Sequence, residues 1–262
     1  MLKFDVSDLY KGTGVSHGLD RGLLVYNDDV LLLEEGMGLG ACAFQTGGYT
    51  YFTSIKSVKK AGSSFEVMCS IDKKLEWKVL GIKSKLITKA LEYIATNIYM
   101  KHENRQEQLL SLGTLLRKLF NVQVCFVKVP SQGDVRIRYR LGHDEIAVDL
   151  SCETEKTGCR LFVMNELGGS IFDKGIIGGE LSASPSGWQK MESSCELYSS
   201  THSLAFTILE RHVPDNVRSK LYWGRELVIN NYCWAGFESE IICDASKFEN
   251  YTYVIKFREV AK

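Results

Sequence analysis

The fold class is decided by a short segment, residues 41–54, with the sequence ACAFQTGGYTYFTS. Its two halves are rich in aromatic, small apolar and β-branched residues, and two glycines at 47–48 separate them. A two-residue glycine loop readily adopts the positive φ angles that the tightest β-hairpins require. The segment therefore predicts two antiparallel strands, and similar short alternating runs occur before and after it.

Turn residues divide the N-terminal part of the chain into six expected strands. Residues 27–29 (NDD) are expected to turn one hairpin, and residues 72–74 (DKK) to separate strands at 65–71 and 75–80. The glycines of residues 36–40 (GMGLG) precede another strand rather than a helix N-terminus. They therefore predict a bend or bulge instead of a phosphate-binding loop. The six strands together predict an up-and-down meander.

One long segment, residues 82–120, has helical periodicity instead. Its apolar residues recur at spacings of three and four in two groups, which a polar stretch at 101–105 separates. The pattern predicts one bent helix or a helical hairpin. Its apolar stripe is expected to pack on the protein's own sheet. The alternative is a partner-binding helix, including one that forms a homo-oligomer.

Alternation returns after residue 121, where arginines at 136, 138 and 140 share one strand face that Glu145 and Asp149 can neutralise. The sequence predicts a mainly β protein: an antiparallel meander or barrel, or a large double-sheet β-sandwich, with one helical insertion at about 83–120. Residues 1–120 are expected to hold the β-meander and the insertion. Residues 121–262 are expected to form a second antiparallel β-region in one continuous structural unit with the first.

Composition limits the classes of partner and cofactor that we expect. Lysine plus arginine equals aspartate plus glutamate at 32 each, so no global field favours nucleic acid. No apolar run approaches the roughly 20 residues of a membrane span, and no signal peptide is apparent, so we expect a cytoplasmic protein. The eight cysteines show no metal-ligand spacing. We therefore expect reduced thiols, no metal and no cofactor.

The strand expected at 203–212 carries the candidate catalytic residues. A period of two places His202, Glu210 and His212 on one strand face whose middle is apolar. A carboxylate beside an imidazole can orient it and raise its basicity, as a general base requires. The alternative is an ordinary polar strand end.

A second cluster, at residues 222–238, mixes aromatic rings with polar groups. A period of two places Glu226, Asn230, Tyr232, Trp234 and Glu238 on one face. Rings supply contact area and polar tips set orientation, which suits a sugar or another flat amphipathic ligand. The alternative is an aromatic sheet core. The candidate ligand-binding residues here are Trp223, Arg225, Glu226, Asn230 and Trp234.

The glycine-rich segment 14–21 adds three candidate ligand-binding residues, His17, Asp20 and Arg21, as a lid or the edge of a site. A structural turn is the alternative.

Two function classes follow from these candidate residues. The first is a cofactor-independent enzyme of isomerase, cyclase, hydratase or lyase type that acts on a small apolar or sugar-like molecule within the β-structure. The second is a non-catalytic module for small-molecule or carbohydrate binding or for assembly.

Overall fold

The computed structural model describes residues 2–6, 18–79, 121–183, 186–228 and 231–260, together with the separate positions 86, 89, 90, 93 and 115. Every strand pairing within these residues is antiparallel. The strands are β1 (Leu2–Asp5), β2 (Leu24–Asn27), β3 (Val30–Leu31), β4 (Gly38–Thr46), β5 (Tyr49–Ala61), β6 (Ser64–Val79), β7 (Val122–Lys128), β8 (Gly133–Leu141), β9 (Glu145–Thr154), β10 (Cys159–Gly168), β11 (Lys174–Ile177), β12 (Glu180–Ala183), β13 (Gly187–Lys190), β14 (Cys195–Ser199), β15 (Leu204–His212), β16 (Val217–Val228), β17 (Asn231–Cys243) and β18 (Lys247–Glu259).

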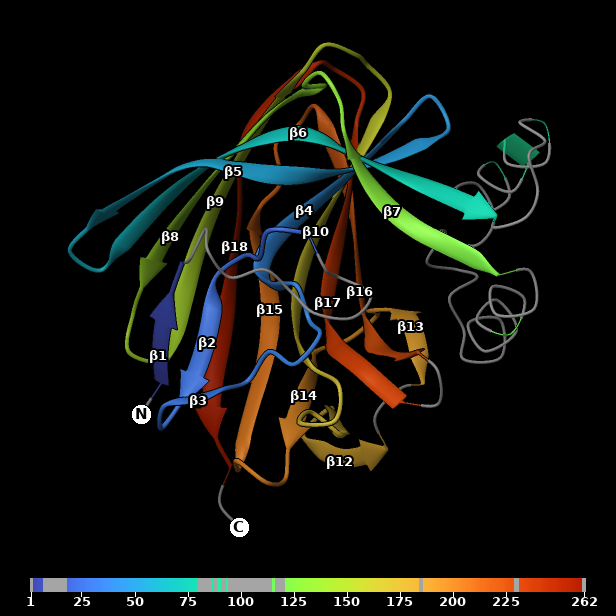
Figure 1. Ribbon diagram of the computed structural model, residues 1–262. Helices are drawn as coiled ribbons and strands as arrows, with labels where there is room; N and C mark the ends of the chain where they lie inside the picture. Colours follow the sequence, from blue (N-terminus) through green and yellow to red (C-terminus); the bar gives the residue numbers. More distant parts are fainter. Residues whose placement is uncertain are drawn as a thin grey trace.

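Fifteen strands form one sheet in the order β12-β11-β14-β15-β18-β9-β8-β6-β5-β4-β10-β17-β16-β13, with β7 beside β6. The sheet curls until its two halves face each other (Figure 1). Phe206 on β15 lies 5.3 Å from Phe237 on β17 between ring centroids, although these strands are far apart in that order. The protein is thus a mainly antiparallel β-sandwich, which confirms the predicted fold class.

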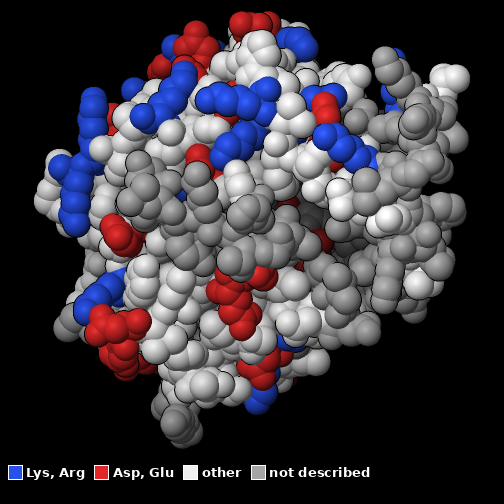
Figure 2. All heavy atoms as spheres, viewed as in Figure 1, with Lys and Arg blue, Asp and Glu red and all other residues white. Residues whose placement is uncertain are grey.

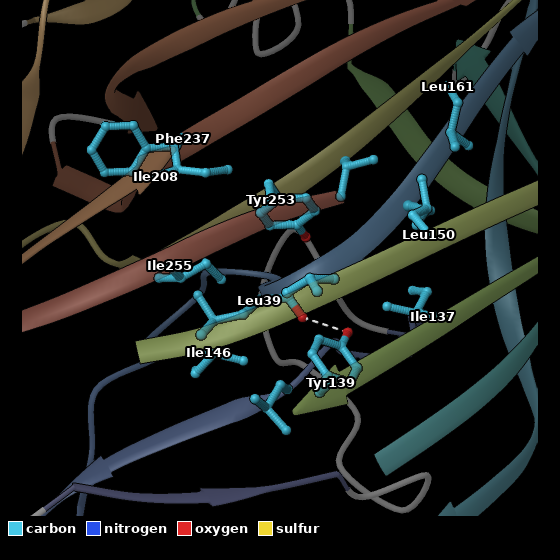
Figure 3. Packing of buried hydrophobic residues seen from close by; sticks show 14 of the residues in the cluster. Leu39, Ile137, Tyr139, Ile146, Leu150, Leu161, Ile208, Phe237, Tyr253 and Ile255 are labelled. Atoms are coloured by element: carbon cyan, nitrogen blue, oxygen red, sulfur yellow. Dashed lines mark hydrogen bonds between the residues drawn. The ribbon is translucent and has the colours of Figure 1, made fainter. Parts of the chain in front are cut away.

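The core lies between the two halves of the sheet and consists of apolar and aromatic side chains. Tyrosines tie the halves together: the Tyr253 hydroxyl on β18 donates to Asn165 Oδ1 on β10, and the Tyr139 hydroxyl on β8 donates to the Leu39 carbonyl on β4 at 2.8 Å (Figure 3). A small sheet, β1-β2-β3, covers part of this core. Burial of the phenols raises the pKa of Tyr139 and of Tyr253. The phenols therefore stay protonated as donors.

Two predicted hairpins are present with the expected turn geometry. Asp28 and Asp29 join β2 to β3 with φ angles of 47° and 66°, and Gly47 and Gly48 join β4 to β5 with 58° and 78°. Positive φ at both central residues is the conformation of the tightest hairpin turns. The glycine segment 36–40 is also a bend, because the pairing of β4 with β10 shifts register there.

The turn predicted at residues 72–74 is wrong, because β6 runs without interruption from Ser64 to Val79. Asp72 is buried and accepts a hydrogen bond from the Ser54 hydroxyl at 2.5 Å. Here the β5–β6 register shifts, and β6 exchanges β8 for β7 as its other neighbour. The polar residues therefore mark a bulge inside a long strand rather than its end.

Only five positions of the predicted helical insertion, 86, 89, 90, 93 and 115, lie among the described residues, and all five are helical. Leu86 and Leu115 belong to the predicted apolar stripe but are 81% and 53% exposed. At these two positions the expected packing on the sheet is absent.

Strands from both sides of residue 120 are direct neighbours, as β6 and β8 show. No helix among the described residues is long and apolar enough to cross a membrane.

The bend in β4 gives a stability prediction for Gly40→Ala. Gly40 has a φ of 80°, and a Cβ there would lie 2.4 Å from the Tyr139 hydroxyl oxygen. Gly47 has a φ of 58° and nothing near its added Cβ, so Gly47→Ala is the matched control for backbone strain alone. We expect Gly47→Ala to cost about 1 kcal/mol of unfolding free energy and Gly40→Ala roughly 3 kcal/mol. Urea denaturation measures both, and equal losses would contradict the packing argument.

Candidate functional site

The outward side of β10, β17 and β16 carries an unusual number of carboxylates. The neighbouring residues Phe237 and Ile241 point into the core, so the residues that alternate with them on β17 point outward. Cross-strand pairing aligns these outward residues in rows, because directly paired residues share a face. The rows are Trp234 with Glu226; Glu166, Gly236 and Gly224; Met164, Glu238 and Tyr222; and Phe162, Glu240 and Lys220. We call this surface the carboxylate face and define it by Glu166, Glu226, Glu238 and Glu240.

Three of these carboxylates are almost fully buried. Glu166, Glu238 and Glu240 are 3%, 2% and 5% exposed. Burying a charged group is costly unless it is paired and hydrogen-bonded, and functional sites are where chains tolerate that cost. Glu240 meets the requirement: the Tyr222 hydroxyl donates to Oε2 at 3.1 Å, and Arg160 pairs with Oε1 at 3.2 Å.

Glu226 is fixed by two tryptophans. The indole N–H of Trp188 on β13 and that of Trp234 on β17 both donate to Glu226 Oε2, at 3.0 and 3.1 Å. Each indole has a single N–H donor, and both donors bind the same carboxylate oxygen. The two rings are thereby held beside the carboxylate face, with their polar ends turned toward Glu226.

Glu166 connects the face to the N-terminal segment. Its Oε2 accepts the backbone N–H of Met37 at 3.2 Å, and the Arg21 guanidinium contacts the Met37 sulfur at 3.1 Å and donates to the Glu35 carbonyl at 3.2 Å. Arg21 is 2% exposed. A small apolar cluster lies over the same side of β4 and β10, formed by Leu19, Met37, Ala41, Ala43, Phe162 and Met164. One edge of the carboxylate face is thus covered by this segment.

Two glycines leave part of the face without side chains. Gly224 and Gly236 are directly paired, in the row between Glu238 and Trp234. A Cβ at Gly224 would lie 2.1 Å from the Gly187 carbonyl oxygen, and one at Gly236 would lie 2.2 Å from that of Asn165, so close backbone approach requires glycine at both. In Figure 2 the surface is hollowed, with acidic atoms at the edge, in the part of the view where β16 and β17 lie in Figure 1.

The structure does not place Glu210 and His212 on one face as predicted. The register of β15 on β18 shifts between them: Glu210 pairs with Tyr253 and His212 with Thr252, which are consecutive and therefore face opposite ways. Arg211 is the extra residue. His212 is exposed, and His202 lies in the turn before β15. Glu210 instead accepts a hydrogen bond from the Tyr251 hydroxyl. The geometric basis for a base with its orienting carboxylate is therefore lost.

A second bulge corrects the predicted aromatic face. Glu226 pairs with Trp234 but Leu227 pairs with Tyr232, so Tyr232 lies on the opposite face from Trp234, Glu226 and Glu238. Tyr232 stacks there against Arg225, whose guanidinium carbon is 3.7 Å from the ring centroid.

Of the predicted ligand-binding residues, Glu226 and Trp234 meet on the carboxylate face. Arg225 donates to the Gly169 and Asp173 carbonyls on the inner side of β16. Trp223 is buried, and a Cβ on Gly175 would lie 3.1 Å from its ring, so the close packing of β11 and β16 accounts for it. Asn230 lies outside the described residues.

The three N-terminal candidates have different outcomes. His17 lies outside the described residues. Asp20 accepts a hydrogen bond from the Ile55 backbone N–H at 2.8 Å and forms an ion pair with Lys73 at 3.2 Å. These contacts hold the chain around Asp20 against β5 and β6. Arg21 lies next to Met37 at the edge of the carboxylate face, as described above. Binding roles for Asp20 and Arg21 stay predictions.

The predicted site residues did not include Glu166, Glu240 or Trp188, and Glu238 was placed on the predicted aromatic face without being named as a ligand-binding residue. The sequence signal for the three glutamates was a carboxylate inside an apolar strand. Glu166 follows the run 161–165, LFVMN, and Glu238 and Glu240 precede Ile241 and Ile242. Charged residues are seldom buried without a reason, so such positions merit selection. Within the described part of the chain, no group of three or more histidine, cysteine, aspartate or glutamate side chains is placed to hold a metal ion.

Comparison with known proteins gives no family. No family model matches the chain, and no curated protein matches it in sequence. Among solved structures, one similar chain is described as a "putative aldose 1-epimerase" from Escherichia coli K12, with 10% identity and a TM-score of 0.47 over 99% of this chain and 96% of that one. Another is 4-alpha-glucanotransferase from Thermococcus litoralis, with 9% identity and a TM-score of 0.35 over 87% of this chain and 29% of that one.

Proposed function

We propose that this protein is a cofactor-independent enzyme of isomerase type that acts on a small neutral sugar at the carboxylate face. The observation that carries the proposal is the combination, on one sheet face, of three features: buried carboxylates, two paired glycines that leave part of the face without side chains, and two tryptophans oriented by Glu226. Carboxylates accept hydrogen bonds from the hydroxyl groups of a sugar, and aromatic rings cover its apolar C–H faces. Four carboxylates on one face also disfavour an anionic substrate such as a sugar phosphate.

Interconversion of sugar anomers is the simplest reaction for such a face, because it needs only proton transfer. A base removes the proton of the anomeric hydroxyl, an acid protonates the ring oxygen, the ring opens, and it closes again on the other side of the carbonyl. Glu238 is our candidate base, because it lies at the centre of the face, in the row next to the two glycines, and is 2% exposed. Glu166 is our candidate acid. It is a diagonal neighbour of Glu238 across Gly236, about 7 Å away along the sheet.

A non-catalytic sugar-binding role is the second candidate. It is favoured by the way protein donors already hold two carboxylates: two indoles fix Glu226, and Tyr222 with Arg160 fixes Glu240. A fixed carboxylate is well suited to bind a hydroxyl with little ordering cost.

Polarimetry of freshly dissolved anomers tests the proposal. We expect the purified protein to accelerate the change in optical rotation of neutral aldoses in proportion to its concentration, and heat-denatured protein to have no effect. Ligand-observed NMR on the same sugars measures binding separately. Binding without acceleration would contradict the enzyme and favour the second candidate. Neither binding nor acceleration across neutral pentoses and hexoses would contradict both.

A further inference from the structure

We propose that Cys159 and Cys243 form a redox modification site, at which oxidation joins β10 to β17 by a cross-strand disulfide. The two cysteines are directly opposite each other in the antiparallel pairing of these strands. Directly paired residues share a face and have Cα atoms about 4.5–5.5 Å apart. A disulfide accepts Cα separations of about 4.4–6.8 Å. The backbone therefore already has the spacing that the bond needs.

Both thiols are free and belong to the same buried cluster. Burial raises the pKa of Cys243 to about 12, and the neighbouring Cys159 thiol acts in the same direction. Burial also raises the pKa of Cys152 on β9, and the Cys243 and Cys159 thiols act in the same direction. A high thiol pKa keeps the pair reduced and slow to react, so the disulfide forms only under sustained oxidation.

Access to the pair comes from the ends of the strands. Cys159 is the first residue of β10 and Cys243 the last of β17, and the adjoining residues 155–158 are exposed. The Cys159 sulfur lies 3.2 Å from the Lys156 carbonyl oxygen in that segment. Strand ends open more readily than strand centres, so local opening admits an oxidant without global unfolding.

With hydrogen peroxide as oxidant, the reaction balances in two steps. One thiolate attacks peroxide and becomes a sulfenic acid, releasing hydroxide, which takes up the thiol proton to give water. The second thiol then attacks that sulfur, the S–S bond forms, and a second water leaves. In sum, two thiols and one peroxide give one disulfide and two waters.

The consequence falls on the strands of the carboxylate face. β10 carries Glu166, and β17 carries Glu238 and Glu240, of which Glu240 is three residues from Cys243. A disulfide at this end fixes the two strands in register. It also constrains the unfolded chain over the long loop between residues 159 and 243, which raises stability. The disulfide changes covalent structure and stability whether or not the carboxylate face acts on a sugar.

The test uses a background in which the two half-buried cysteines are replaced, Cys125→Ser with Cys233→Ser, so that only buried thiols remain. Folded protein is treated with excess hydrogen peroxide, alkylated and digested without reduction. We expect a single crosslinked peptide pair that contains Cys159 and Cys243, a loss of two titratable thiols, a melting temperature raised by several degrees, and reversal by dithiothreitol.

Cys243→Ala should abolish the crosslink, whereas the matched control Cys69→Ala should retain it, since Cys69 pairs with Ile55 and Val135 rather than with a cysteine. Peptide mapping of the unmodified chain gives the same information if a variant fails to fold. An unchanged thiol count after prolonged oxidation of the folded protein would overturn the proposal. A crosslink that excludes either cysteine would do the same.

Discussion

Glu238→Gln is expected to reduce the rate of anomer interconversion by about 10²- to 10⁴-fold while sugar binding is largely retained. Glutamine keeps the size of the side chain and one acceptor oxygen, but it cannot take up a proton at neutral pH. A positioned general base contributes a factor of about that size. Polarimetric kcat and KM, with ligand-observed NMR for affinity, separate the loss of chemistry from a loss of binding.

The matched control is Glu66→Gln on β6. Glu66 is partly exposed and pairs with Arg138 at 2.8 Å on the other half of the sheet, so its replacement removes a carboxylate without touching the carboxylate face. Its kcat should remain within about twofold of the unmodified protein. Normal kcat in Glu238→Gln would show that the base lies elsewhere. An equal loss in both variants would point to a general effect on folding.

The fold was largely predictable because its signals are local. The hairpin turns at 28–29 and 47–48 follow from residues that accept positive φ, and period-two alternation then marks the strands on either side. The false turn at Asp72 arose because a polar cluster has the same composition at a bulge as at a turn. Only the neighbouring strands β7 and β8, remote in sequence, make it a bulge.

The site was less predictable, and two single-residue bulges explain why. Arg211 and Cys233 each add one residue to a strand, which reverses the face of every residue beyond it. Nothing in the composition around Arg211 or Cys233 distinguishes a bulge from continued alternation. Glu226 and Trp234 were nevertheless found, because both lie on the same side of the bulge near Cys233 as the carboxylate face. Glu166 and Trp188 come from distant strands that only the fold brings together.

Asn165→Ala is expected to lower the free energy of unfolding by about 4 kcal/mol, the largest stability effect among the changes considered. Asn165 is fully buried, and its Oδ1 accepts both the Gly40 backbone N–H at 3.0 Å and the Tyr253 hydroxyl at 3.1 Å (Figure 3 shows Tyr253). Removing the acceptor leaves two buried donors unsatisfied, at roughly 1–3 kcal/mol each, and the lost side chain adds a cavity. Urea denaturation measures the loss.

One part of Asn165 opposes this loss. Its Nδ2 has no hydrogen-bond partner among the described residues, so deleting the amide also removes an unsatisfied donor, which returns about 1 kcal/mol. Asn216→Ala is the control, because the exposed Asn216 amide donates to the Lys247 carbonyl at 2.8 Å and should cost under about 1 kcal/mol. Similar losses in the two variants would show that the Asn165 oxygen does not join the halves of the sandwich. A large loss confined to Asn165→Ala would identify that oxygen as the link between β10 and β18. The loss should be smaller when Tyr253→Phe, in the same chain, removes one of the two donors left without an acceptor.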